Sequence, residues 1–314
     1  MDKVQHPLQS WEWGEFRKLT GVRVVREGGI QVTIHKIPHT SWNIGYCPKT
    51  GVINGEMVQT LQQIAKENAC IMIKCEPKIE VTQSHSDTVT LQKLGFVAGR
   101  PLFTKYNFVL DVSPSETELL ANFKPKTRYN IRVAEKHGVR VEIDNSSEAF
   151  AKYLELTEET TKRQGFYAHG RDYHQKMWKV LCKAEIAHLL VAKYQGQIIT
   201  TWVLFKYGDT LYYPYGASTR EHREVMANNL VMWEAIKLAK KWKLKYLDMW
   251  GALGPDPDPN DPWYGFHTFK SGYGARHVEY IGTWDYVAKP VLYKIYRIVE
   301  RLRWWWLRYK KGRD

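Results

Sequence analysis

Residues 187–217 read AHLLVAKYQGQIITTWVLFKYGDTLYYPYGA, and this stretch decides the fold of the second half of the chain. Its runs 187–194, 197–206 and 210–217 are rich in β-branched and aromatic residues, and Gln195-Gly196 and Gly208-Asp209 separate them. Such runs joined by short glycine-containing turns predict an antiparallel meander. After a polar loop, residues 227–242 carry apolar side chains at helical spacing, and 245–250 is expected to be a strand.

The first half of the chain repeats this order. Residues 32–37 and 42–47 are expected to be strands, 56–68 an amphipathic helix and 70–75 a further strand. Strand, loop, helix and strand in both halves predict two copies of one α/β unit. Between the copies, a long helix is expected over 147–164.

Composition narrows the class of protein. The chain has 314 residues, of which 44% are apolar, enough for two medium domains or one large domain. It has no apolar run of membrane-spanning length, no secretory signal pattern and four cysteines without metal-ligand spacing, so we expect a reduced, cytoplasmic protein. The net charge of +13 suits an anionic partner, whether nucleic acid, sugar nucleotide or membrane surface.

One short motif has the composition of a binding site. Residues 266–274 read FHTFKSGYG and follow the strand expected over 245–250 and a loop rich in Pro and Asp. Lys270 offers a compact cation, and the neighbouring Phe269 offers a face on which a base or sugar could stack. The glycines would let the backbone approach a ligand closely. The alternative is a solvated lysine on an ordinary turn.

Two basic segments suggest contacts with anions. A helix opening after Pro125 would carry Lys126 and would place Arg128 and Arg132 four residues apart on one face, either for phosphate contacts or simply for solvation. A helix expected over 291–311 combines basic residues with Tyr and Trp, as membrane-interface helices do. Packing on its own domain with a wet basic face is the alternative.

Several common catalytic motifs are absent from the sequence: the phosphate-binding loop Gly-x-x-x-x-Gly-Lys, the zinc motif HExxH and the nucleophile elbow Gly-x-Ser-x-Gly. No metal or cofactor site is expected. The strand, loop and helix units resemble the acetyltransferase-like (GNAT-like) fold, whose acyl-CoA members bind pyrophosphate with a glycine-rich loop. The corresponding loop here, 220–229, has no glycine, which disfavours acyl-CoA, although Arg220 and Arg223 could bind another phosphate.

Five short motifs, in this order along nearly the whole chain, together resemble the Fem family of non-ribosomal peptidyltransferases, which build peptidoglycan bridges from aminoacyl-tRNA. They are QSWEWGEFR at 9–17, NFVLD at 107–111, KTRYNIR at 126–132, YGAS at 215–218, and Phe269-Lys270 with Gly274. The resemblance implies two tandem GNAT-like domains in an α/β (α+β) fold. The first would comprise 1–106 completed by 280–314, and the second 107–279. There is no room for the long helical hairpin of some members.

The resemblance also implies roles for particular residues. Lys270 would stabilise the oxyanion or the tRNA end, and Phe269 would stack near the terminal adenosine. The precursor would be bound by Arg17, Glu76, Tyr173, Tyr215 and a basic residue before Tyr173, which is His169 by counting and Arg171 by residue type. Lys126, Arg128 and Arg132 are candidates for contacts with tRNA.

The implied partners are an aminoacyl-tRNA and a nucleotide-linked or lipid-linked peptidoglycan precursor, with a peripheral membrane contact through the C-terminal helix. Two rival functions remain open. One is a GNAT-like N-acyltransferase that uses another activated donor. The other is a non-catalytic protein that binds RNA or membranes.

Overall fold

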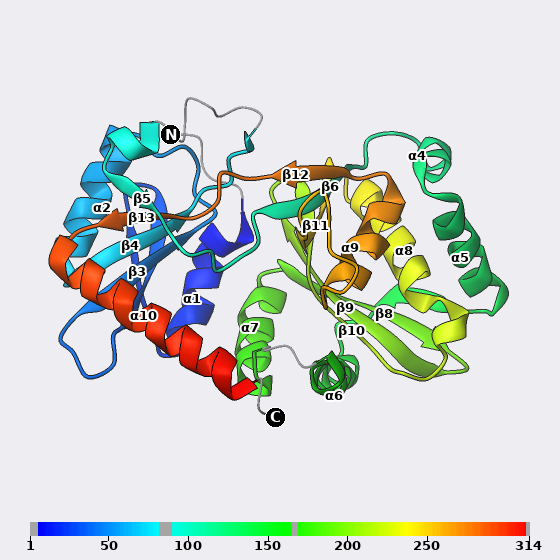
Figure 1. The fold of residues 1–314 in the computed structure, drawn as a ribbon. Coiled ribbons are helices and arrows are strands. Elements are labelled where there is room, and N and C mark those ends of the chain that lie inside the picture. The colour runs from blue at the N-terminus through cyan, green and yellow to red at the C-terminus, as the bar shows by residue number, and fades with distance from the viewer. Residues whose placement is uncertain (1–5, 82–89, 165–168, 312–314) are drawn as a thin grey trace. The chain divides into compact units, whose positions relative to one another are not determined.

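The computed structural model describes residues 6–81, 90–164 and 169–311, and the chain folds into two compact units (Figure 1). The first unit contains Gly21–Leu102 and Tyr280–Asp314. The second unit contains Gln5–Thr20 and Phe103–Glu279. Each unit is built on its own mixed sheet.

The sheet of the first unit has the strand order β1-β2-β3-β4-β13-β5. Strands β3 and β4 are parallel and helix α2 connects them, whereas the other neighbours are antiparallel. The elements are β1 (Arg23–Glu27), β2 (Ile30–Lys36), β3 (Asn43–Pro48), α2 (Gly55–Glu67), β4 (Cys70–Glu76), β5 (Phe96–Ala98), β13 (Trp284–Val287) and α10 (Pro290–Lys311).

The sheet of the second unit has the order β12-β6-β11-β10-β9-β8-β7, with β10 and β11 parallel. Its strands are β6 (Tyr106–Asp111), β7 (Arg140–Ile143), β8 (Ala187–Tyr194), β9 (Gln197–Tyr207), β10 (Thr210–Ser218), β11 (Tyr246–Ala252) and β12 (Arg276–Glu279). Its helices are η1 (Pro7–Gln9), α1 (Trp11–Leu19), α4 (Glu116–Asn122), α5 (Pro125–Lys136), α6 (Ser147–Gln164), α7 (Arg171–Lys183), η3 (Arg223–Val225), α8 (Ala227–Lys241), α9 (Tyr264–Lys270) and η4 (Ser271–Tyr273).

The expected repeat is confirmed. The series β1-β2-β3-α2-β4 and the series β8-β9-β10-α8-β11 have the same order and the same strand directions: a meander, then a helix that leads into a parallel strand. A parallel neighbour needs a crossover connection, and α2 and α8 supply it. The α/β fold of two tandem GNAT-like domains is therefore the observed fold, and residues 6–81, 90–164 and 169–311 contain no protruding helical hairpin.

Helices cover both faces of the second sheet. One core holds the apolar faces of α4, α5 and α8, and the other holds those of η1, α1, α6 and α7. The N-terminal segment was expected in the first domain, but α1 packs in the second unit. There it buries Trp13 and Phe16, with the ring of Phe16 4.8 Å from that of Tyr173 on α7. Burial of these two aromatic rings outweighs the proximity of α1 to β1 in the sequence.

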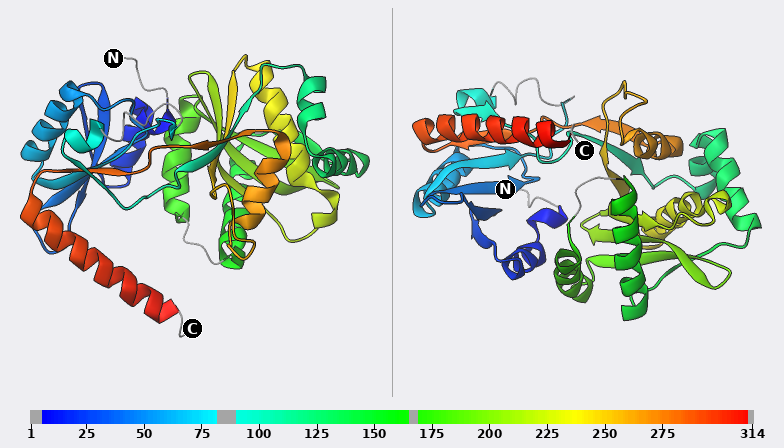
Figure 2. Two further views of the ribbon diagram at one scale, coloured as in Figure 1. Left: turned by 45° about the horizontal axis from the view of Figure 1, so that its top comes forward. Right: turned by 60° about the horizontal axis from the view of Figure 1, so that its bottom comes forward.

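Helix α10 is anchored to the first sheet at its N-terminal end (Figure 2). Asp285 of β13 is fully buried and accepts hydrogen bonds from Lys74 at 2.7 Å and from Tyr293 of α10 at 3.0 Å. Arg297, one turn further along, donates to the Tyr293 hydroxyl at 3.0 Å. A buried ammonium on one oxygen and a neutral hydroxyl on the other keep the buried carboxylate of Asp285 satisfied. Within the described residues, no helix has the length and apolar content needed to cross a membrane.

Candidate active site

Lys270 is the last residue of α9 and is buried, with 7% of its surface exposed. Its Nζ donates a hydrogen bond to the carbonyl oxygen of Gly251 at 2.7 Å and lies 5.9 Å from the centroid of the Tyr213 ring. The alternative of a solvated turn lysine is therefore wrong. Burial lowers the pKa of Lys270 to about 8, and the charge of Asp248 acts in the opposite direction.

The glycines around Lys270 serve packing rather than ligand approach. A Cβ on Gly272 would lie 2.3 Å from Oγ1 of Thr127, so this glycine lets η4 pack directly against α5. Gly274 has a φ of 65°, a left-handed conformation that glycine adopts readily, and it ends η4. The glycines were expected to let the backbone approach a ligand, whereas in the structure they allow a close approach between segments of the protein itself.

Strands β10 and β11 separate next to this lysine. Their parallel pairing ends at Tyr212 and Asp248, and both strands have a register shift just beyond. In β10 the cause is Pro214, which has no N–H for the ladder. Because the bulge interrupts the alternation of side chains, Tyr213 and Tyr215 pack against different cores, on opposite faces of the sheet.

Phe269 lies half-buried beside the start of α8. Its ring centroid is 6.2 Å from that of Trp202 and 5.4 Å from that of Tyr273. The first turn of α8 holds the same aromatic rings, because Asn228 accepts from the indole N–H of Trp202 at 3.2 Å and Asn229 donates to the Tyr273 hydroxyl at 3.1 Å. The glycine-free loop before α8 thus leads into a helix start that bonds to the aromatic rings beside Phe269.

A second cluster on the other face of the same sheet brings together four of the sequence-predicted residues. The guanidinium of Arg17 lies 5.8 Å from the ring centroid of Tyr173, and His169 stacks on the same ring at 3.6 Å. A hydrogen bond between Tyr173 and Tyr215 affects the pKa of both, although burial is the main reason that both pKa values are raised. Burial and the nearby charge of Arg17 lower the pKa of His169.

His169 and Arg171, the two candidates that the sequence left open for the basic residue before Tyr173, have different surroundings in the structure. Arg171 is exposed and its Nε donates to Glu158 at 2.8 Å, so its charge is already paired. His169 contacts the Arg17 cluster instead. Sequence reasoning missed His174, which is buried in this cluster and bonds to the Tyr153 hydroxyl at 3.0 Å. Burial lowers the pKa of His174 to about 4, so it is neutral at pH 7.

Two other sequence candidates have structural partners. Glu76 lies in the first unit, where its carboxylate accepts from Tyr46 at 2.6 Å and from the amide of Leu102 and the hydroxyl of Thr283 at 2.8 Å each. Arg128 donates to the carbonyl oxygens of Ala121 at 2.9 Å and Phe123 at 2.6 Å, at the end of α4. Arg128 and Arg132 lie four residues apart on α5, as predicted, but Arg128 bonds the last carbonyl groups of α4 and so caps that helix.

The exposed face of α5 has a different composition from the one expected. Lys126, Tyr129 and Arg132 are all exposed and follow one another at three-residue intervals, which places them along one side of the helix. The ring of Tyr129 is 61% exposed. This face offers two cations and an aromatic surface between them.

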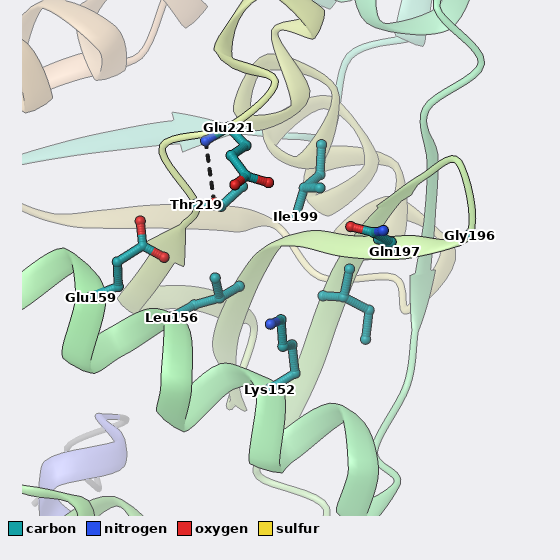
Figure 3. A pocket seen from close by; sticks show the side chains of 9 residues that line it. Lys152, Leu156, Glu159, Gly196, Gln197, Ile199, Thr219 and Glu221 are labelled. Carbon is teal, nitrogen blue, oxygen red and sulfur yellow. Dashed lines mark hydrogen bonds between the residues drawn. The ribbon is translucent and has the colours of Figure 1, made fainter.

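A pocket of about 570 Å³ lies elsewhere on the second unit (Figure 3). Its walls come from α6, from the β8–β9 turn, from the start of β9 and from the loop after β10. They are formed by Lys152, Leu156, Glu159, Gly196, Gln197, Ile198, Ile199, Thr219 and Glu221. None of the sequence-predicted site residues lines it.

Comparison with known proteins assigns the class. Residues 121–263 match a family model described as an acetyltransferase (GNAT) domain. The meander, the parallel pair and the crossover helix of the second unit fall largely within this match. The chain is an acyltransferase of GNAT-like fold.

The relatives define the class further. The lipid II:glycine glycyltransferase of Staphylococcus aureus (strain MRSA252) is 23% identical, with 92% of this chain and 89% of the relative covered. The protein of the same name from Staphylococcus epidermidis (strain ATCC 12228 / FDA PCI 1200) is 22% identical, with 94% and 90% covered. The crystal structure of FemX has a TM-score of 0.83 at 22% identity and covers 94% of this chain and 95% of its own. The resemblance to the Fem family is thereby confirmed.

The buried state of Lys270 predicts a pH-dependent stability. Its folded pKa of about 8 is below the usual 10.5, so between these values the unfolded chain binds the extra proton. Raising the pH through this range should therefore stabilise the wild type relative to Lys270→Met, by roughly 3 kcal/mol in total. Urea unfolding of both proteins at several pH values measures this difference. A difference that stays constant from pH 8 to 10.5 would contradict a buried ammonium.

Proposed function

We propose that this enzyme transfers an amino acid from an aminoacyl-tRNA to an amine on the stem peptide of a peptidoglycan precursor. The observation that carries this proposal is the buried cation of Lys270 beside the point where β10 and β11 separate. The names of the relatives support the acceptor, since they act on lipid II. The donor is inferred from the chemistry below.

The reacting ester would lie where β10 and β11 separate, next to Lys270. The acceptor amine would attack the ester carbonyl and form a tetrahedral oxyanion. The ester C–O bond then breaks as the amide forms, and the ribose oxygen leaves as a hydroxyl with the proton that the amine gives up. A cation held in a site of low dielectric stabilises such an oxyanion far more than it would in water. In this assignment Lys270 is the catalytic residue, and Phe269 provides the aromatic face for the terminal adenosine.

The exposed face of α5 fits the RNA part of the donor. Lys126 and Arg132 would contact phosphates, and the ring of Tyr129 between them gives a surface on which an unpaired base can stack. Arg128 is left out of this role because it caps α4. A thioester donor is less well supported, since the loop before α8 has no glycine to bring backbone amides to a pyrophosphate.

The Arg17 cluster fits the phosphates of the precursor. Arg17 supplies a fixed positive charge, and Tyr173 and Tyr215 supply hydroxyl donors from different elements. This cluster and Lys270 lie on opposite faces of the second sheet, where β10 provides Tyr215 to one and Tyr213 to the other. The acceptor peptide would reach the ester through the separation between β10 and β11. Glu76 would act on the peptide only if its three hydrogen bonds in the first unit were rearranged.

Helix α10 fits a membrane surface, which would bring the enzyme to a lipid-linked acceptor. Its exposed apolar residues recur at intervals of three and four, and they form one stripe. They are Val291, Ile295, Ile298, Val299, Leu302, Trp305 and Trp306. Lys294, Arg301 and Arg303 are exposed alongside. An apolar stripe with basic neighbours binds anionic bilayers.

The test of the function is a transfer assay with a panel of radiolabelled aminoacyl-tRNAs and with nucleotide-linked and lipid-linked precursors. One donor should give a labelled precursor, and Lys270→Ala should lower kcat about 10²–10³-fold, as loss of an oxyanion-stabilising group does. Lys66→Ala, which removes an exposed lysine of α2, is the control. Transfer from an acyl-CoA but from no tRNA would select the rival enzyme. Binding of RNA or membranes without transfer from either donor would select the non-catalytic function.

A matched pair of arginines tests the acceptor site. Arg17→Ala should raise the KM for the precursor roughly 10–100-fold, because it removes a charged hydrogen-bond donor to phosphate. Arg171→Ala should change it less than about twofold, since an exposed ion pair contributes little. Steady-state kinetics with the nucleotide-linked precursor gives both values. Equal effects of the two substitutions would place the phosphates elsewhere.

Vesicle binding tests the role of α10. The variant Ile298→Asp/Leu302→Asp should bind vesicles of anionic phospholipid at least about tenfold more weakly than the wild type, since two apolar side chains no longer enter the bilayer. Val52→Asp, at an apolar position that is 65% exposed in the same unit, should bind as the wild type does. Co-sedimentation measures both. Unchanged binding of the α10 variant to vesicles would exclude the apolar stripe of α10 as the membrane-binding face.

A further inference from the structure

We propose that Asp248 is a positioning residue for Lys270, acting through the bulge of β11. The bulge would hold the lysine in place, and the carboxylate of Asp248 would keep it protonated. The role of Asp248 in catalysis rests on the proposed function. The geometry around Asp248 and the first test below are independent of that function. Neither Asp248 nor the bulge was anticipated from the sequence.

The carboxylate of Asp248 organises the bulge from inside the protein. Asp248 is 1% exposed, and its Oδ1 accepts two hydrogen bonds of 2.8 Å, one from the backbone N–H of Trp250 and one from the side-chain amide of Asn107. The first bond closes a turn over the two residues that follow Asp248. The second ties this turn to β6, the neighbouring strand.

The turn forces Trp250 into an unusual backbone conformation. Its φ is 63°, in the left-handed region that residues other than glycine rarely adopt. Such a conformation persists only where the surroundings impose it, and it is concentrated at functional sites. Here the Asp248 hydrogen bond to the Trp250 amide is the polar contact that imposes it.

The bulge presents the next carbonyl group to the lysine. Beyond Trp250, the oxygen of Gly251 accepts from Lys270 Nζ at 2.7 Å. A Cβ at Gly251 would lie 2.7 Å from Cγ2 of Thr104, so the chain is held closely from that side as well. The dipeptide Trp250-Gly251 is thus bound to a carboxylate through its first N–H and to an ammonium through its last C=O.

The carboxylate of Asp248 also affects the pKa of Lys270, because it is the acidic group among the charges around this lysine. Tyr213 of β10 presents its ring to Nζ, and Tyr273 of η4 is neutral because burial raises its pKa. The charge of Lys270 acts on His267 of the same helix, and His267 is in turn influenced by His277 of β12 and by Lys124. Among these groups of the described chain, Asp248 alone is acidic. Its charge raises the pKa of Lys270 against the effect of burial.

The first test is a titration of Lys270 that needs no substrate. In protein with ¹³C-labelled lysine, assigned with Lys270→Arg, the Cε resonance of Lys270 should titrate near pH 8. In Asp248→Asn the midpoint should move to lower pH, by about one unit for a nearby opposite charge. Asp111→Asn, which removes an exposed carboxylate from the end of β6, is the control and should leave the midpoint in place. An unchanged or raised midpoint in Asp248→Asn would overturn the proposal.

A measurement on the wild type covers the case in which Asp248→Asn does not fold. The amide resonances of Trp250 and Ala252 should shift with the same midpoint as Lys270, since the bulge joins all three. If the amide resonances of Trp250 and Ala252 do not shift while Lys270 titrates, the coupling through the bulge is overturned. If the transfer assay succeeds, the alkaline limb of its pH profile should also move to lower pH in Asp248→Asn. A titration as expected without any transfer would retain this proposal and reject the proposed function.

Discussion

The hydrogen bond from the buried ammonium of Lys270 to the carbonyl oxygen of Gly251 is the contact around which the candidate site is arranged. A charge removed from water must find an oxygen, and a regular strand would direct its carbonyls along the ladder. Strand β11 leaves regular geometry after Asp248, where the hydrogen bond from the Trp250 amide to the Asp248 carboxylate holds Trp250 in the left-handed region and turns the next carbonyl group toward Lys270. The pairing with β10 ends at the same place, so the residues that anchor the lysine lie directly beside the point where the two strands separate.

The two repeats differ at this position, which explains why the candidate site lies in only one of them. In the first unit the parallel pairing of β3 with β4 continues from Asn43 and Cys70 to Pro48 and Glu76. In the second unit the pairing of β10 with β11 ends after Tyr212 and Asp248. Pro214 removes a donor from β10, and the Asp248 turn displaces β11. One copy of the unit thus keeps its parallel pair together over the full length of the strands, and in the other copy the parallel pair separates.

The sequence predicted what depends on local pattern. Helix α6 and strand β8 match the expected ranges, because side-chain periodicity and turn residues determine them. It could not show that Arg128 caps α4, or that Arg171 pairs with Glu158 while His169 faces Arg17, because these outcomes depend on which side chains meet after folding. The bulge at Trp250 had no sequence signal, since a glycine would normally mark a positive φ. Pro214 within a strand was such a signal for β10, and it was missed.

The net charge of +13 overstates the positive surface offered to an anionic partner. Several cations are used inside the fold: Lys74 pairs with buried Asp285, Lys240 donates to the carbonyl oxygen of Val112 at 2.9 Å, and Arg128 caps a helix. A cation that bonds a backbone carbonyl or a buried carboxylate cannot also release counterions from a nucleic acid or contact a bilayer. The charge available for recognition of an anion is therefore smaller than the total charge, and the proposed contacts use only cations that lack such a role inside the fold, in the Arg17 cluster, on α5 and along α10.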